Sequence, residues 1–223
     1  MKIVLFDFDG TLSARDANAE FYKYTFFRSF RQFLFLPWLI AGAVGKLLNP
    51  NGKWCREAMR RYLTPGMARK YAAGFIKEHR RNRFGWAAEK IAEEKARGAT
   101  VVCISASPDF LLPPLVADLG FDAVISSVMD KAKPWRYDKP CWGEWKVDRL
   151  DEWANGTIIM NHTMDPGLPP SPFGLRRTSR APLHRRGTLE VVRAYSDSKS
   201  DLPMMRLAKE QVWVDSRTGM RKK

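Results

Sequence analysis

Two aspartates near the N-terminus directly follow a short apolar run. Asp7 and Asp9 stand in the motif DFDGT at residues 7–11, directly after the run IVLF at residues 3–6. Such a run predicts a buried strand, and ligands of parallel sheets gather beyond the carboxyl ends of the strands. The two carboxylates are therefore expected at an edge where a site forms, although a turn with two solvated acids would show the same pattern.

Further polar residues follow other apolar runs. Ser105 closes the run VVCI at residues 101–104, and the next residues, 106–108, are expected to open a helix. A hydroxyl beside the N–H groups of a helix start would suit a phosphate. Asp197 and Asp201 follow a later run, and Lys146 lies between the two segments. Clustered carboxylate oxygens suit Mg²⁺, which keeps several waters and takes one or two carboxylates plus a substrate phosphate.

The elements that must position these residues alternate between strands and helices. Strands are predicted at residues 3–6, 100–104, 123–125, 189–195 and 211–214, and helices at residues 108–119, 142–153 and 202–209. This alternation predicts an α/β fold with a Rossmann-like parallel sheet.

Two segments depart from the alternation. Residues 17–97 are helical, with breaks at residues 49–52 and 65–66, and predict a cap inserted after the first strand. The domain prediction is a core of residues 1–16 and 98–223 and a cap of residues 17–97. Within the core, the Pro/Arg-rich residues 155–188 predict a flexible insertion; a basic arm for an anionic partner and a translated sequence error are the alternatives.

In this order, the motifs closely resemble those of the haloacid dehalogenase (HAD) superfamily of phosphohydrolases. The family's first motif matches residues 7–11, its second Ser105, its third Lys146 and its fourth Asp197 with Asp201. Lys139 and Lys133 are alternatives for the third. The inserted cap resembles the subgroup that includes phosphoserine phosphatase. The segments SASP at residues 105–108 and YSDS at residues 195–198 look closer to a branch that includes phosphatidylglycerophosphate phosphatases of the C type.

This resemblance implies a Mg²⁺-dependent phosphatase that works through an aspartyl-phosphate. Asp7 would attack phosphorus, and Asp9 would protonate the leaving alcohol and later deprotonate the attacking water. Two sets of binding residues are also implied. Mg²⁺ would be held by Asp7, the backbone carbonyl of Asp9, Asp197 and Asp201, and the substrate phosphate would be bound by Thr11, Ser105, Ala106 and Lys146.

The charge of the chain lies mainly in the predicted cap. The 223 residues carry a formal net charge of +14, and residues 23–97 alone hold 17 Lys/Arg against 5 Asp/Glu. Residues 32–45 hold no charge, but this run is shorter than the ~20 residues of a spanning helix. Residues 26–48 therefore have two interpretations: a helix packed on the core, or a segment lying in an anionic membrane surface.

The predicted substrate is a small phosphomonoester such as phosphoserine, or a lipid phosphate such as phosphatidylglycerophosphate. The alternative function is a non-enzymatic basic protein that binds nucleic acid or a membrane surface. Nucleic acid is disfavoured because the tryptophans lack the regular interleaving of a base-stacking platform. Three widely spaced cysteines and the absence of a secretory signal predict a cytoplasmic protein, with a peripheral position at the inner face of the membrane as the alternative.

Overall fold

The computed structural model describes residues 1–48, 60–156 and 190–220. The predicted insertion at residues 155–188 lies outside the described residues apart from its first two, and so do Cys55 and the break at residues 49–52. Cys103 and Cys141 are free and buried thiols.

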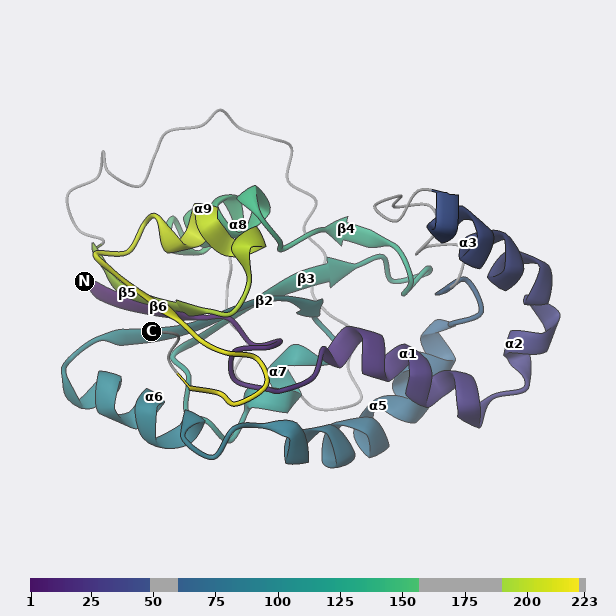
Figure 1. Ribbon diagram of the computed structural model, residues 1–223, viewed down its shortest axis with the longest axis horizontal. Helices are drawn as coiled ribbons and strands as arrows, with labels where there is room; N and C mark the ends of the chain where they lie inside the picture. The colour runs from purple at the N-terminus through teal and green to yellow at the C-terminus, as the bar shows by residue number, and fades with distance from the viewer. Residues whose placement is uncertain (49–59, 157–189, 221–223) are drawn as a thin grey trace.

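The described strands form a six-stranded sheet in the order β4-β3-β2-β1-β5-β6 (Figure 1). Every neighbouring pair is parallel except β3 and β4, which are antiparallel. The predicted Rossmann-like sheet is therefore confirmed. The strand bounds are β1 Lys2–Phe6, β2 Thr100–Pro108, β3 Ala123–Met129, β4 Tyr137–Lys139, β5 Glu190–Ser196 and β6 Glu210–Trp213.

Side chains alternate between the two faces of the sheet, and each face has its own apolar core. Val4 and Phe6 point to one face, which is covered by α6 (Ala87–Ala96) and α7 (Leu112–Val116). Ile3 and Leu5 point to the other, which is covered by α8 (Glu144–Ala154) and α9 (Leu202–Met205). Strands that are apolar on both faces are typical of parallel sheets covered by helices, and this burial fixes β1 in the centre.

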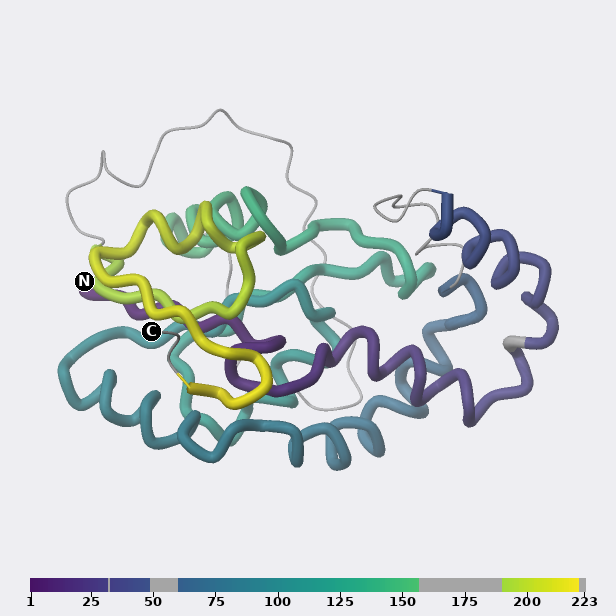
Figure 2. Tube along the Cα trace, in the orientation of Figure 1, coloured from purple at the N-terminus to yellow at the C-terminus, as the bar shows by residue number. Residues whose placement is uncertain are grey.

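The chain leaves the sheet after β1 and returns to it at β2 through a series of helices (Figure 2). These are α1 (Ala17–Arg28), α2 (Arg31–Leu34), α3 (Leu36–Leu48), α5 (Pro65–His79), a 3₁₀ turn (Arg80–Asn82) and α6. Asp16 caps α1 by accepting a hydrogen bond from the Ala19 N–H group at 2.7 Å. Thr64 caps α5 in the same way.

The helices between β1 and β2 do not all lie away from the sheet. Phe21 of α1 and Phe75 of α5 belong to the same core cluster as Val4 and Phe6 of the sheet, and Ile91 of α6 packs there too. In contrast, α2 and α3 extend to the end of the molecule farthest from β5 and β6 (Figure 1). The cap boundaries at residues 17 and 97 stay a prediction.

The bounds of two helices were predicted wrongly from the sequence. The helix predicted at residues 108–119 begins only at Leu112, because β2 continues to Pro108 through an irregular register with β3. The helix predicted at residues 202–209 ends at Met205. The short strand β4 was not predicted.

Candidate active site

Asp7 lies one residue beyond the carboxyl end of β1 and is buried with a lysine. One oxygen of its carboxylate, Oδ1, is 2.7 Å from Nζ of Lys146. The other, Oδ2, accepts a hydrogen bond of 3.2 Å from the hydroxyl of Thr11. Lys146 is only 2% exposed, and it reaches the strand edge from the first turn of α8. The fold thus places an ammonium and a hydroxyl on the two oxygens of one buried carboxylate.

Lys146 also joins Asp7 to the end of β5. Its Nζ atom is 2.7 Å from Oδ2 of Asp201, and the same oxygen accepts a 2.8 Å hydrogen bond from the hydroxyl of Ser196. The alternative lysines lie elsewhere, since Lys139 pairs with Glu152 at 3.6 Å and Lys133 is exposed. Among the three candidates for the third motif, Lys146 is the one placed beside Asp7.

Thr11 connects Asp7 to the fourth motif. Its hydroxyl is 3.4 Å from Oδ1 of Asp197, and it accepts a 3.0 Å hydrogen bond from the Asp197 backbone N–H group. Gly10 lets the loop approach this closely, because a Cβ atom there would lie 2.2 Å from Oδ2 of Asp197. The φ of Gly10 is +81°, a conformation that side chains other than hydrogen disfavour. The backbone conformation therefore favours glycine here, and a Cβ atom would also force the Asp197 carboxylate to move.

Asp9 is held by two serines of β2 and by the start of α1. Its Oδ2 atom accepts hydrogen bonds from the hydroxyls of Ser105 at 3.0 Å and Ser107 at 2.7 Å. Its Oδ1 atom accepts a 2.7 Å hydrogen bond from the N–H group of Ala17, the first residue of α1. These hydrogen bonds orient the Asp9 carboxyl group, and the predicted metal contact of Asp9 is its backbone carbonyl.

Burial and excess negative charge raise the pKa of both motif aspartates. Burial, together with the neighbouring carboxylates of Asp201 and Asp9, raises the pKa of Asp7 to about 8 although Lys146 opposes the shift. Burial raises the pKa of Asp9 to about 6, and the hydrogen bonds from Ala17 and the serines limit the rise. Burial alone would lower the pKa of Lys146, but the carboxylates of Asp7 and Asp201 outweigh it and raise that pKa. Because a single buried ammonium does not balance the charge of these carboxylates, a further positive charge would be stabilised here.

The donor set beside Thr11 fits Mg²⁺. No cluster of three or more His, Cys, Asp or Glu side chains that could hold a metal ion occurs in residues 1–48, 60–156 and 190–220. However, Mg²⁺ needs only one or two carboxylates, with waters and a phosphate completing its six ligands. Asp7 and Asp197, which share the Thr11 hydroxyl, supply two hard oxygen donors of this kind. The raised pKa of Asp7 agrees with a site that takes up a cation.

Two serines of the site were not predicted from the sequence, and the local structure around a third was predicted wrongly. Ser107 and Ser196 hold Asp9 and Asp201, but buried serines at strand ends carry no distinctive sequence signal. Ser105 was expected beside a helix start. It lies instead within β2, and its Oγ atom accepts a 3.1 Å hydrogen bond from the Ser107 N–H group. Ala106 lies between these two serines and is partly exposed.

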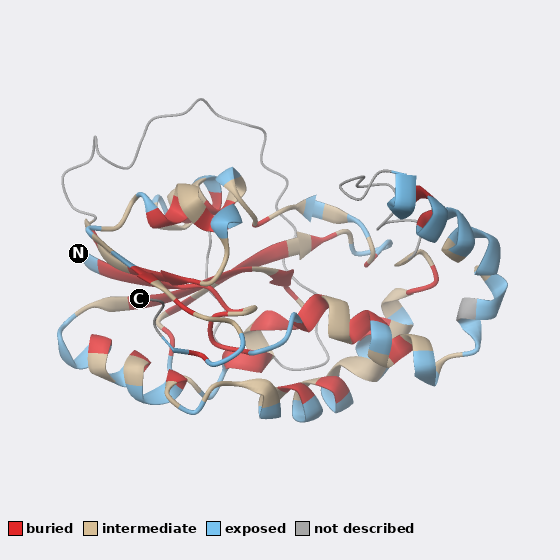
Figure 3. Ribbon diagram, viewed as in Figure 1, coloured by how far each residue is buried: buried red, intermediate tan, exposed pale blue. Residues whose placement is uncertain are grey.

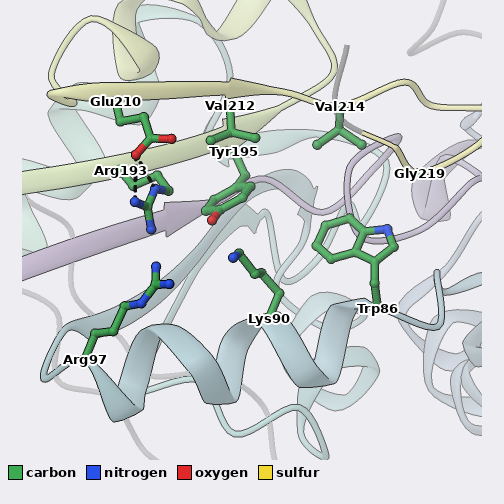
Figure 4. A pocket seen from close by; sticks show the side chains of 9 residues that line it. All are labelled: Trp86, Lys90, Arg97, Arg193, Tyr195, Glu210, Val212, Val214 and Gly219. Atoms are coloured by element: carbon green, nitrogen blue, oxygen red, sulfur yellow. Dashed lines mark hydrogen bonds and ion pairs between the residues drawn. The ribbon is translucent and has the colours of Figure 1, made fainter. Parts of the chain in front are cut away.

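A separate cavity lies between α6 and the strands β5 and β6 (Figure 4). Trp86 and Lys90 line it from the helix side, and Arg193 lines it from β5. Arg193 forms ion pairs with Glu94 and, at 2.6 Å, with Glu210. The cavity contains none of the predicted site residues, and its cations pair with acids of the same region. It is a poor candidate for binding an anionic substrate.

Comparisons with known proteins agree with the motifs. A family model described as haloacid dehalogenase-like hydrolase matches residues 4–157. Three solved structures are similar: a protein of unknown function from Bordetella pertussis Tohama I, an apo phosphoserine phosphatase, and a phospho-aspartyl intermediate analogue of phosphoserine phosphatase.

The identities to these three structures are low. The first is 18% identical with a TM-score of 0.64, and 96% of this chain matches 89% of that one. The two phosphatases are 18% and 19% identical with TM-scores of 0.59 and 0.56, and in both cases 96% of this chain matches 86% of the other. At such identities the likeness shows a shared fold. A search of curated proteins gave no match.

Proposed function

Because the chain belongs to the haloacid dehalogenase-like hydrolase family, we propose that it is a Mg²⁺-dependent phosphomonoester hydrolase that forms an aspartyl-phosphate on Asp7. The predicted hydrolase is confirmed by this family match, and the phosphoserine phosphatase neighbours support a phosphatase of that subgroup. The single observation that carries the proposal is the environment of Asp7. A buried carboxylate with Lys146 on one oxygen and Thr11 on the other is oriented as a nucleophile would be.

The first step transfers the phosphoryl group to the enzyme. An oxygen of Asp7 forms a bond to phosphorus while the bond from phosphorus to the substrate alcohol breaks. The protonated carboxyl group of Asp9 gives its proton to the leaving oxygen. A pKa raised to about 6 suits this role, because such a group exchanges its proton near neutral pH.

The second step releases phosphate. A water molecule attacks phosphorus, Asp9 takes a proton from it, and the bond between phosphorus and Asp7 breaks, which restores both carboxyl groups. Ser105 and Ser107 keep the Asp9 carboxyl in one orientation through both steps. Lys146 offsets part of the negative charge that Asp7 and the phosphoryl group share.

Asp7, Asp197 and the backbone carbonyl of Asp9 would hold the metal, with Asp201 beside them. When bound, Mg²⁺ supplies the positive charge that offsets repulsion between the phosphate and the carboxylates. Thr11, Ser105, Ala106 and Lys146 are proposed to contact the phosphate. Thr11 and Lys146 lie within hydrogen-bond distance of the Asp7 carboxyl group, which the phosphate must reach.

Two substrate classes follow from different observations. The phosphoserine phosphatase neighbours favour a small phosphomonoester such as phosphoserine. The exposed apolar side chains of α2 and α3 favour a lipid phosphate such as phosphatidylglycerophosphate. A panel of phosphoserine, sugar phosphates, nucleotides and phosphatidylglycerophosphate, assayed for phosphate release, separates the two. A cytoplasmic location for the enzyme stays a prediction.

The proposal is tested by hydrolysis of an aryl phosphate with Mg²⁺ or with EDTA. We expect activity only with Mg²⁺ and its loss in Asp7→Asn. The matched control is Asp148→Asn, the same substitution at an exposed site on α8, which should keep the wild-type rate. Mass spectrometry after acid quenching should find a phosphoryl group on the peptide that contains Asp7. Hydrolysis by Asp7→Asn would refute the mechanism, and an inactive wild-type protein that binds polyanions would favour the non-enzymatic alternative.

A further inference from the structure

Exposed apolar side chains gather on one end of the molecule. Among the described residues, ten of the twelve large apolar side chains that are exposed lie between Phe27 and Leu48, at the end of α1 and along α2 and α3. The exposed fraction is 88% for Phe30 and 83% for Leu47. Figure 3 shows α2 and α3 largely in the colour of exposed residues, in contrast to the buried sheet. Large side chains of this kind are normally scattered, so a cluster marks an interaction surface.

The exposed residues of α3 form a continuous stripe. Leu36, Ile40, Val44 and Leu47 are spaced by four, four and three residues, which places them along one face of the helix. The buried residues of α3, Gly42 and Gly45, lie on the opposite face. We call this stripe, together with Phe27, Phe30, Phe33 and Leu34, the apolar tip. Since α3 buries Gly42 and Gly45 and exposes Leu36 and Leu47, this apolar stripe is directed away from the protein, whereas Leu39 packs against the core.

The charges within residues 21–48 are of one sign, although Arg28 pairs at 3.3 Å with Glu78 of α5. Residues 21–48 contain no Asp or Glu but do contain Lys23, Arg28, Arg31 and Lys46. Arg28, Arg31 and Lys46 are exposed within or beside the tip. Trp38, which is 47% exposed, lies against the Arg61 guanidinium at 4.3 Å from the ring centre. An apolar face with basic neighbours complements a surface that is apolar inside and anionic outside.

We propose that the apolar tip docks the protein on an anionic phospholipid bilayer, with α2 and α3 lying in the plane of the interface. No helix in the described parts of the chain is long and apolar enough to cross a membrane. With 13 residues, α3 is about 20 Å long, which suits a helix lying at the headgroup boundary. Arg28, Arg31 and Lys46 would meet lipid phosphates while the leucines and phenylalanines enter the acyl boundary.

The proposal is tested by flotation of the full chain with vesicles of phosphatidylcholine, alone or mixed with phosphatidylglycerol. We expect the protein to float with the mixed vesicles and to bind much less to the neutral ones. Leu47→Glu should lower the partition coefficient at least about tenfold, because it removes a leucine that would be buried in the bilayer and adds a negative charge that the anionic lipids repel. Lys46→Gln should lower it about fivefold, and only on anionic vesicles at low salt.

Met220→Glu is the matched control. Met220 is 71% exposed but lies outside the apolar tip, so the same loss of an apolar side chain should leave both flotation and phosphatase activity unchanged. Thermal unfolding of each variant shows that the fold is kept. Equal loss of binding in Leu47→Glu and Met220→Glu, or a wild-type protein that stays in the aqueous fraction, would overturn the proposal. So would light scattering that finds a dimer which Leu47→Glu dissociates, because the tip would then bind a second copy.

The docking surface does not depend on the proposed catalytic function. The inactive variant Asp7→Asn should float as well as the wild type, since Asp7 lies at the strand edge and not in the tip. A protein that floats without hydrolysing phosphate esters would support docking and refute the phosphatase. A protein that hydrolyses phosphate esters but never floats would support the phosphatase and refute docking.

Discussion

Replacement of Lys146 by methionine is the most direct test of how the site is held together. The ammonium of Lys146 lies 2.7 Å from Asp7 and 2.7 Å from Asp201, and all three side chains are at most 6% exposed. Methionine has a similar length but no charge, so Lys146→Met leaves two buried carboxylates without their cation. Removing one partner of a buried ion pair costs about 3–5 kcal/mol of unfolding free energy.

The loss should depend on pH in a defined direction. The pKa of Asp7 is already raised from 3.8 to about 8 with the lysine present. A carboxyl group with a raised native pKa keeps its proton in the folded state and releases it on unfolding, so the unfolding free energy falls as the pH rises from about 4 to 8. Without Lys146 the pKa of Asp7 rises further. The destabilisation by Lys146→Met should therefore change little between pH 5 and 7, where Asp7 keeps its proton in both folded proteins, and grow above about pH 8, where only the wild-type Asp7 ionises.

Urea unfolding followed by tryptophan fluorescence at pH 6 and pH 9 measures this difference. The matched control is Lys139→Met, because Lys139 forms a 3.6 Å pair with Glu152 that is partly exposed. Such a pair contributes less than about 1 kcal/mol to the unfolding free energy, and this contribution depends little on pH between the two conditions. If Lys146→Met fails to fold at pH 9, the comparison of the two variants at pH 6 still tests the reasoning. Equal losses in the two variants, or a loss for Lys146→Met that does not change with pH, would refute it.

Three further changes test other parts of the site. Gly10→Ala should lower kcat more than about tenfold and destabilise the fold by about 1 kcal/mol, because its Cβ would meet Asp197; a variant with wild-type kinetics contradicts this. Ser107→Ala should lower kcat about tenfold, since it removes the 2.7 Å hydrogen bond that orients Asp9, whereas an unchanged kcat would remove Ser107 from the site. Burial raises the pKa of Asp109 to about 7, so between pH 4 and 7 it should lower the wild-type unfolding free energy by on the order of 4 kcal/mol. Urea titrations of Asp109→Asn should lack this component.

The central strands could be predicted from the sequence because their apolar runs have one interpretation. Residues buried on both faces of a parallel sheet read as continuous apolar segments, as in β1 and the first half of β2. In contrast, β4 has three residues, Tyr137–Lys139, and none of them is buried. Its position depends on pairing with β3, which no local pattern encodes.

The candidate site was predictable in its residues but not in its contacts. The motif acids follow strands, so their common edge follows from the fold class. The hydrogen bonds of Asp9 do not, because Ser105 and Ser107 lie 96 and 98 residues away and meet it only when β2 pairs with β1. The expected helix start after Ser105 was wrong for a related reason. Pairing with β3 extends β2 to Pro108, and this tertiary contact outweighs the local preference for a turn.

The charged residues of this protein lie in two regions, one buried and one exposed, where salt screens them differently. At the strand edge, one lysine faces Asp7 and Asp201 in a nearly water-free site, where salt screens little and a metal cation would have its largest effect. The positive excess lies instead on residues 23–97, where exposed side chains are screened strongly. On the proposed function, the carboxylate site would repel a phosphate until a cation is bound, whereas the exposed basic side chains would attract anions most strongly at low salt. The proposed function therefore predicts that attraction of an anionic substrate and its hydrolysis depend on different residues, so that each can be changed without the other.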